Sequence, residues 1–358
     1  MLVIPRLVAE YRTRDVPYFG SGQVIVDPSG PVPRLLVRTG EALVVHELPG
    51  GGGDVADPVA VFPGPTTGPV VGYRPVAYDL SHAVLTDEGR YQMVTREGVR
   101  LWELPMPRVD SRPVMSATWC RSPRGEPQVW LVVAVDPERD GQVDPSRAVS
   151  LALLDTRGAE IERMVVPLVG ENQGVLPILG SDGKVVAISN CGSVRPVTFT
   201  LGHDGRTVSL LSERKLLSYS AARSLLVTVG LDDSGRRTDV RWHDARNGTT
   251  VSELSLAEIL SSEPDDGPSH VDPYISWDGG GLMDDESLLV MLEDEDPYEE
   301  GGDDWRGMSH WSVTRGAGCH HIKYPIPLRD SQLYDSYPLG DGTWLMGGRQ
   351  ELYRWSLR

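Results

Sequence analysis

Hydrophobic and polar residues alternate in short runs along most of this chain, and glycine-containing turns separate many of the runs. The segment 88–105, EGRYQMVTREGVRLWELP, is typical, because two alternating runs flank a turn at Gly98. Side chains of a strand point alternately to the two faces of its sheet, so a period of two predicts β-strands rather than helices. Most of the chain is therefore predicted to be β-structure joined by tight turns.

The second of these two runs has counterparts along the whole chain. Similar strands occur at seven places and recur roughly every 40 to 70 residues. The copies align at Glu47, Glu103, Asp155, Gly202, Asp244, Ser312 and Ser356. Because a four-stranded propeller blade takes about 40 to 45 residues, this spacing indicates one blade for each copy.

Several of the aligned strands carry an aromatic residue or a histidine just before the aligned position. The pairs are Trp102-Glu103, His243-Asp244, Trp311-Ser312 and Trp355-Ser356. They stand where WD repeats often have Trp-Asp, and the whole chain resembles the WD-repeat-like seven-bladed β-propellers. The resemblance implies an all-β fold with seven four-stranded antiparallel blades. We place these residues and His46 in third strands, where they are expected to pack in the core. The Gly-His pair that commonly opens such repeats is absent, so no specific family is identified.

The repeat predicts one β-propeller domain over residues 1–358. Its blades are expected at approximately 20–63, 81–115, 116–168, 173–214, 215–256, 272–326 and 330–358. The last unit lacks a fourth strand, so we expect the N-terminal segment 2–11 to pair with the last strand and complete the seventh blade. Pro5 is tolerated there because the outermost strand of a blade has a free edge. A pair of β-sandwiches is the alternative architecture, since regular short strands also suit that class.

In a four-stranded blade the loop between the second and third strands lies on the same rim as the link to the next blade. The long insertions are expected on this long-loop rim, and they comprise residues 64–81, 136–147, 231–238, 256–272 and 293–308. Ser255 with Glu258 forms a capping-box pattern, which predicts a short helix with Leu256, Ile259 and Leu260 on one face. Long loops on a rigid scaffold usually carry function, so this rim is the predicted functional face.

The most acidic of these insertions is the segment 293–304, EDEDPYEEGGDD. The candidate partner-binding residues are Glu293, Asp294, Glu295, Asp296, Glu299, Glu300, Asp303, Asp304 and Trp305. Such a block of like charges is either a solvated loop or a binding surface for a basic partner or a cation. The spacing of the carboxylates does not separate these interpretations.

A second insertion, residues 136–147, partly matches the calcium-binding loop of EF-hands. Positions one, three, five and nine are Asp136, Glu138, Asp140 and Asp144. Gly141 falls on position six, where the loop turns sharply, but Arg147 replaces the bidentate glutamate of position twelve. A weak calcium site and an ordinary polar loop are both compatible with this pattern, and no other cofactor is expected.

The charge balance narrows the class of partner. The chain has 34 basic and 51 acidic residues, which gives a net charge of -17. Such a charge repels nucleic acid and anionic membranes and favours basic proteins or cations. The N-terminus lacks a signal-peptide pattern, and no run approaches the roughly 20 apolar residues of a membrane helix. Three cysteines without a Cys-x-x-Cys pair indicate a reduced, cytoplasmic setting, and the preference for arginine over lysine suits a bacterial genome.

Recognisable catalytic motifs are absent from the sequence. His320 and His321, beside Cys319, point to opposite faces if they lie in a strand, which disfavours a shared metal ion. We therefore expect a monomeric, non-catalytic interaction module that binds a basic protein. One alternative is a propeller hydrolase or lyase that uses rim carboxylates with a divalent cation. Another is an inhibitor whose acidic surface imitates nucleic acid.

Overall fold

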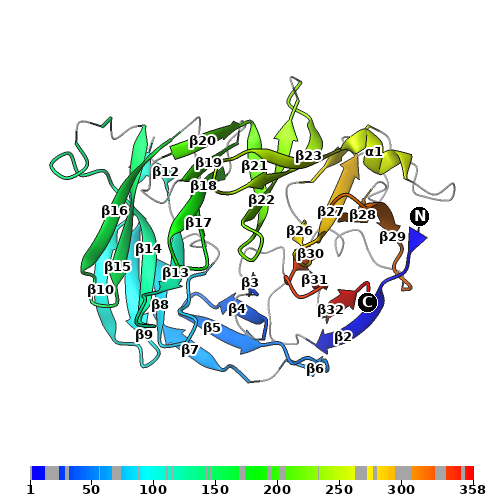
Figure 1. Cartoon of the computed structure of the whole chain (residues 1–358). Helices are drawn as coiled ribbons and strands as arrows, with labels where there is room; N and C mark the ends of the chain where they lie inside the picture. Colours follow the sequence, from blue (N-terminus) through cyan, green and yellow to red (C-terminus); the bar gives the residue numbers. More distant parts are fainter. Residues whose placement is uncertain are drawn as a thin grey trace, which may run out of the picture. The chain divides into compact units, whose positions relative to one another are not determined.

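The structure, a computed structural model, describes residues 2–12, 24–28, 32–55, 57–66, 74–87, 89–109, 112–114, 116–141, 143–144, 147–168, 174–191, 196–201, 207–232, 234–262, 272–276, 280–294, 308–326, 336–347 and 351–358. These residues are almost entirely β-structure, and their sheets follow one another along the chain as blades (Figure 1). The chain is a seven-bladed β-propeller, as the repeat predicted. It divides into unit one (Met1–Ser21, Leu48–Val55 and Glu213–Arg358) and unit two (Gly22–Glu47 and Ala56–Ser212).

Unit two holds the first four blades, and in three of them four antiparallel strands lie in chain order across the sheet. The first blade consists of β3 (Val24–Asp27), β4 (Arg34–Arg38), β5 (Ala42–Glu47) and β7 (Ala60–Pro63). The third consists of β13 (Ala117–Arg121), β14 (Pro127–Val133), β15 (Ala148–Asp155) and β16 (Glu160–Pro167). The fourth consists of β17 (Gly174–Leu179), β18 (Val185–Cys191), β19 (Val197–Leu201) and β20 (Thr207–Ser212).

The second blade corrects one strand assignment. Its sheet consists of β8 (His82–Asp87), β9 (Arg90–Thr95) and β10 (Arg100–Pro105), with β10 at one edge. On the other side of β8, Val76 bridges Ala83 and supplies the innermost neighbour. The run that carries Trp102 is therefore the fourth strand of this blade and not the third, and the turn between β8 and β9 joins the second and third strands. A separate ribbon of β11 (Arg108–Val109) and β12 (Arg112–Pro113) follows.

Unit one holds the remaining three blades. The fifth consists of β21 (Arg214–Ser220), β22 (Leu225–Leu231), β23 (Arg237–Asp244) and β24 (Thr250–Ser255). The sixth consists of β25 (Pro273–Ile275), β27 (Ser287–Asp294), β28 (Ser309–Thr314) and β29 (Gly318–Ile322), with β26 (Gly281–Leu282) also paired to β27. The seventh contains β30 (Ser336–Pro338), β31 (Thr343–Gly347) and β32 (Glu351–Ser356).

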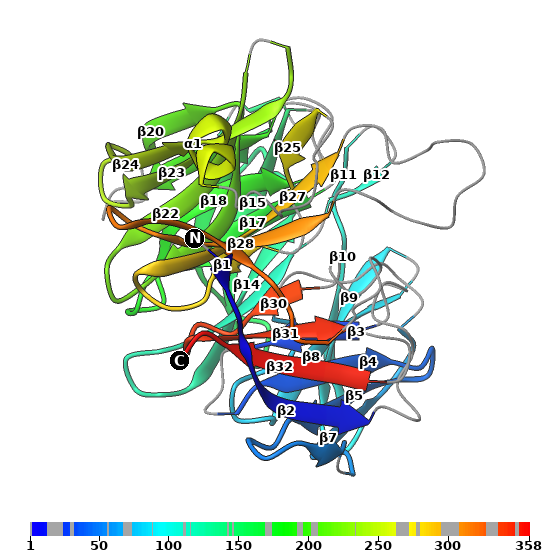
Figure 2. The ribbon, with the colours of Figure 1, turned by 90° about the vertical axis from the view of Figure 1, so that its right-hand side faces the viewer.

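The N-terminal segment completes the seventh blade. β2 (Arg6–Arg12) pairs antiparallel with β32 along its length, which confirms the predicted closure from Arg6 onward, whereas Leu2 and Val3 do not take part in it. Before it, β1 (Leu2–Val3) pairs parallel with β29 of the sixth blade, and Pro5 lies in the break between β1 and β2, where no strand hydrogen bond needs its missing N–H. Figure 2 shows this segment running from β1 to β2 beside β32. A further strand, β6 (Gly53–Asp54), pairs parallel with β2.

The predicted short helix is present as α1 (Leu256–Ser261). The Ser255 side chain accepts from the Glu258 N–H, and the Glu258 carboxylate accepts from the Ser255 N–H at 2.8 Å, so the capping box is complete. Ile259 is fully buried, and Leu256 and Leu260 pack against the same hydrophobic cluster as it does. The predicted apolar face therefore attaches this helix to the fifth and sixth blades.

Hydrophobic side chains fill the spaces between successive blades within each unit. In unit one, Trp311 and Trp242 share a cluster of the fifth and sixth blades, and Trp355 lies in a cluster of the sixth and seventh. Trp311 and Trp355 are fully buried, which confirms their predicted packing role, and His243 is buried as expected. Trp102 is only half-buried, because its strand lies at the edge of a blade.

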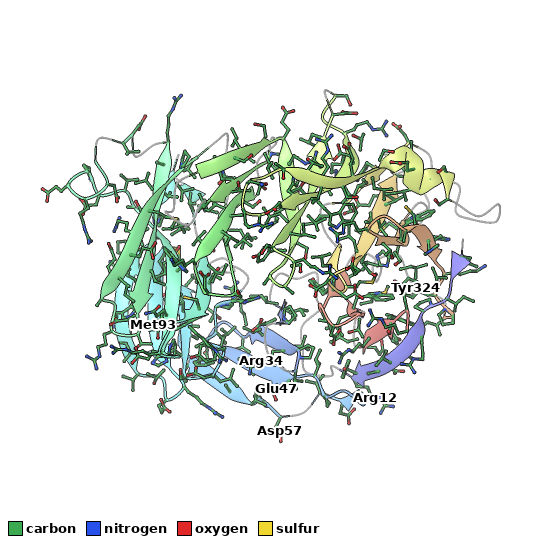
Figure 3. The ribbon with its side chains drawn as sticks, viewed as in Figure 1. Arg12, Arg34, Glu47, Asp57, Met93 and Tyr324 are labelled. Atoms are coloured by element: carbon green, nitrogen blue, oxygen red, sulfur yellow. The ribbon has the colours of Figure 1, made fainter. Side chains whose placement is uncertain are left out.

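One polar group is built into the packing between the sixth and seventh blades. The Tyr324 hydroxyl accepts a hydrogen bond from Trp344 Nε1 at 3.0 Å and lies 2.7 Å from His310 Nδ1. Tyr324 is labelled in Figure 3. Because that hydroxyl is desolvated, the pKa of Tyr324 is raised well above its ordinary value. Tyr324 therefore stays a neutral phenol that joins the two blades by hydrogen bonds.

Candidate functional site

The predicted acidic segment begins within the described part of the chain and continues beyond it. Glu293 and Asp294 are the last two residues of β27 in the sixth blade. The other predicted partner-binding residues lie outside the described residues, and they are Glu295, Asp296, Glu299, Glu300, Asp303, Asp304 and Trp305. The structure therefore gives the geometry at the start of the acidic segment.

A tyrosine holds the first carboxylate of the segment. Tyr274 of β25 lies opposite Glu293 in the antiparallel pair of β25 and β27, and its hydroxyl donates to Glu293 Oε2 at 2.8 Å. Burial, and then the hydrogen bond to Glu293 and its charge, raise the pKa of Tyr274 to about 12. The tyrosine therefore keeps its proton at neutral pH and remains a donor. The other carboxylate oxygen, Glu293 Oε1, is buried and has no hydrogen-bond partner among the described residues.

Two arginines of the fifth blade lie beside the Tyr274–Glu293 pair. The guanidinium carbon of Arg237 lies 3.9 Å from the centre of the Tyr274 ring, which is a cation–π contact. Arg236 Nη2 donates to the Asp272 carbonyl oxygen at 2.8 Å and also forms an ion pair with the Asp272 carboxylate. We name this group the Tyr274 corner: Arg236, Arg237, Asp272, Tyr274 and Glu293. It joins the second-to-third loop of the fifth blade to the sixth blade within unit one.

The calcium-like loop of the third blade is held by an arginine. The Asp140 side chain is only 3% exposed. Its Oδ2 accepts from the Asp136 N–H at 2.7 Å, from Ser150 Oγ at 2.7 Å and from Arg163 Nη1 at 3.0 Å. Burial opposes ionisation, but the hydrogen bonds from Asp136 and Ser150 and the charge of Arg163 outweigh it, so the pKa of Asp140 is lowered.

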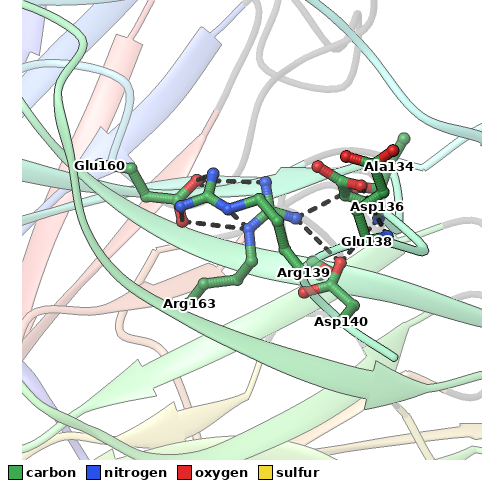
Figure 4. Close-up of polar contacts among 8 residues, drawn as sticks. Ala134, Asp136, Glu138, Arg139, Asp140, Glu160 and Arg163 are labelled. Carbon is green, nitrogen blue, oxygen red and sulfur yellow. Dashed lines mark hydrogen bonds and ion pairs between the residues drawn. The ribbon is translucent and has the colours of Figure 1, made fainter. Parts of the chain in front are cut away.

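The same arginine ties the loop to the fourth strand of its blade. Arg163 lies between Asp140 and Glu160, and its Nη1 also donates to the Ala134 carbonyl oxygen at 3.3 Å (Figure 4). Arg139 of the loop forms a second ion pair with Glu160 at 2.9 Å. Arg163 thus supplies, next to Asp140, the positive charge that a bound cation would bring.

The contact between Arg163 and Asp140 involves one of the four predicted calcium ligands, which are Asp136, Glu138, Asp140 and Asp144. In the parts of the chain that the structure describes, no three side chains of His, Cys, Asp or Glu are grouped so that they could hold a metal ion. A cation bound through Asp140 Oδ2 would have to displace Arg163 from that oxygen. Calcium binding by this loop stays a prediction, and sequence spacing could not have indicated the competing arginine.

A serine beside a histidine occurs in the turn before β8. Ser81 Oγ lies 2.7 Å from His82 Nδ1 and 2.6 Å from Asp79 Oδ1. Since a carboxylate accepts more strongly than an imidazole and the serine has one proton, the hydroxyl donates to Asp79 and accepts from His82. In this arrangement the histidine does not act as a base toward the serine. The contacts are those of a local turn around Leu80, which has a positive φ of 59°.

The sequence did not indicate most of the residues that organise the Tyr274 corner and the calcium-like loop. Tyr274, Arg236 and Arg237 belong to short segments with no motif, and Arg163 lies in an outer strand. Cross-strand register brings Tyr274 to Glu293, and the return of β16 along β15 brings Arg163 to the calcium-like loop. Only the register of the strands, and no local pattern, connects these residues.

No family model matches this sequence. No curated protein matches it either. Among solved structures, the chain is similar to the WD40 domain of SCAP from fission yeast, at 10% identity and a TM-score of 0.48, over 99% of this chain and 98% of that chain. It is also similar to Sqt1 of Saccharomyces cerevisiae, at 9% identity and a TM-score of 0.44, over 99% of both chains. A third is the β-propeller domain of the Trilobed protease from Pyrococcus furiosus, at 10% identity and a TM-score of 0.43, over 94% of this chain and 95% of that chain.

Within the described ranges, no helix has the length and apolar character that crossing a membrane requires.

Proposed function

We propose that this protein is a non-catalytic interaction module that binds a basic protein partner through its long-loop rim, with the acidic segment 293–304 as the main contact. The observation that carries this proposal is the fixed start of the segment. Glu293 is held by Tyr274 at the end of β27, so the first carboxylate of the segment has a fixed position on the sheet. The net charge of -17 adds long-range attraction for a basic surface.

The Tyr274 corner would give this contact its local structure. Arg236 and Arg237 offset part of the negative charge beside Glu293, and they join the loop of the fifth blade to the sixth. A partner would therefore bind next to a Glu293 side chain whose position is fixed by the Tyr274 corner. Exposed ion pairs contribute about 0 to 1 kcal/mol each, so the charges would act mainly through the association rate and its dependence on salt.

The test is capture of partners from native lysate, compared between two matched variants. One variant neutralises rim carboxylates with Glu295→Gln, Asp296→Asn, Glu299→Gln and Glu300→Gln. The control removes the same number of charges from first-to-second and third-to-fourth turns with Glu97→Gln, Glu126→Gln, Asp182→Asn and Asp204→Asn. We expect basic proteins to be captured by the wild type and the control but to be lost by the rim variant. Equal capture by the two variants, or the same salt slope for a captured partner, would refute the proposal.

A further inference from the structure

The segment Leu48–Val55, which we name the strap, leaves the first blade and lies on the seventh. It connects β5 to β7 in sequence, yet it belongs to unit one together with β2. Within it, β6 pairs parallel with the end of β2 at Tyr11 and Arg12. The Val55 N–H adds a hydrogen bond to the Arg12 carbonyl oxygen at 3.1 Å. The strap therefore covers part of the outer edge of the strand that completes the seventh blade.

Two close contacts hold the strap against β2. Tyr11 is fully buried, and its hydroxyl donates to the Pro49 carbonyl oxygen at 2.9 Å. Gly52 has a φ of +76°, and a Cβ at this position would lie 2.7 Å from the Glu10 carbonyl oxygen. Only glycine combines this backbone conformation with so close an approach. The strap backbone thus lies directly on the backbone of β2.

The pairing of the strap is much shorter than that of the strand it covers. β2 pairs with β32 from Arg6 to Arg12, whereas β6 contributes two residues of parallel pairing. Unpaired strand edges are templates for pairing with another chain. Since a second copy offers the same β32 edge, β2 of one copy fits the other without any new interface. Residues 13–23, which join β2 to β3 in sequence, have a contour length of about 36 to 40 Å.

We propose that the strap decides whether β2 stays in its own chain. With the strap in place, β2 remains on its own β32 and the chain stays a monomer. With the strap displaced, β2 leaves, and two copies exchange their N-terminal strands. The partner on this edge is therefore a second copy of this chain, and the device is the strap.

The experiment measures the exchange directly with a fluorescein-labelled synthetic peptide of residues 1–12. Full-length wild-type chain, Gly52→Ala, Gly51→Ala and Tyr11→Phe are incubated with the peptide, and its incorporation is followed by fluorescence anisotropy. Gly51→Ala is the matched control, because a Cβ on Gly51 meets nothing within 4 Å. We expect Gly52→Ala to incorporate the peptide about tenfold faster than the wild type, since the strained, crowded alanine loosens the strap. Gly51→Ala should match the wild type.

Tyr11→Phe is the second test of the proposal, and it applies if Gly52→Ala does not fold. This substitution removes only the Tyr11 hydroxyl, which donates to the Pro49 carbonyl oxygen of the strap, and it should also speed incorporation of the peptide. Light scattering after size-exclusion chromatography should show more dimer for both strap variants than for the control. Equal incorporation rates for Gly52→Ala and Gly51→Ala, or for Tyr11→Phe and the wild type when Gly52→Ala does not fold, would overturn the proposal.

Discussion

Acid is expected to weaken the fold through one buried histidine, His243 of β23. Its Nε2 lies 2.9 Å from Thr228 Oγ1, and its Nδ1 lies 3.3 Å from the Gly248 carbonyl oxygen. Arg214 Nε donates to Thr228 Oγ1 at 2.7 Å, so the proton of the Thr228 hydroxyl is directed to His243 Nε2. A neutral ring with its proton on Nδ1 satisfies every one of these contacts. A second proton on Nε2 would break the bond from Thr228.

The magnitude follows from the pKa of this group. Burial first, and then the positive charge of Arg214, lower the pKa of His243 from 6.5 to about 4. The folded state thus prefers the neutral ring, and this preference contributes its full stability above pH 6.5. The contribution is lost as the pH falls from about 6.5 toward about 4, because the unfolded chain takes up the proton first. At about pH 5 the loss relative to about pH 8 is roughly 2 kcal/mol, and its limit is about 3 kcal/mol.

The assay is urea unfolding at about pH 8 and about pH 5, for the wild type and for His243→Gln. The glutamine amide can accept from Thr228 and donate to Gly248 but does not titrate. We expect the wild type to lose about 2 kcal/mol more than His243→Gln between the two pH values. His320→Gln, which makes the same substitution at a half-buried histidine of β29, is the control substitution. An equal loss for the wild type and His243→Gln would refute the reasoning.

Three further outcomes are expected. Removal of residues 1–12 should lower the melting temperature and cause aggregation, since the edge of β32 that faces β2 becomes unpaired; an unchanged melting temperature and a monomeric state would contradict this. Arg163→Gln frees the Asp140 carboxylate, so if the loop binds calcium, millimolar calcium should raise the melting temperature of this variant more than that of the wild type; equal shifts, or none, would leave no cation site there. Ser255→Ala should cost about 1 kcal/mol in urea unfolding, because it removes the helix cap, whereas Ser261→Ala at the other end should cost less; equal costs would argue against the cap.

The repeat in the sequence was enough to predict seven blades and the strand that closes the last one, although it did not assign the strands of the second blade correctly. Alternation of apolar and polar residues reflects the two faces of a strand, so it survives in any sheet, and the missing fourth strand of the last repeat left one place for the N-terminal segment. The capping box before Leu256 is also local, because its two hydrogen bonds join residues only three apart. The alternation and the capping box depend on neighbours in sequence, whereas the closure joins residues 6–12 to residues 351–356 and was predicted from the incomplete last repeat.

The tertiary structure decided what depends on neighbours across strands. The run at Trp102 is an edge strand rather than a third strand, and nothing local separates the two, since both alternate in the same way. The spacing at Asp140 suggested calcium ligands, but the return of β16 places Arg163 on that carboxylate. Strand register alone brings Tyr274 to Glu293. The strap was unpredictable for the same reason: its contacts with β2 join residues about 40 positions apart, and only the folded backbone brings Gly52 against Glu10.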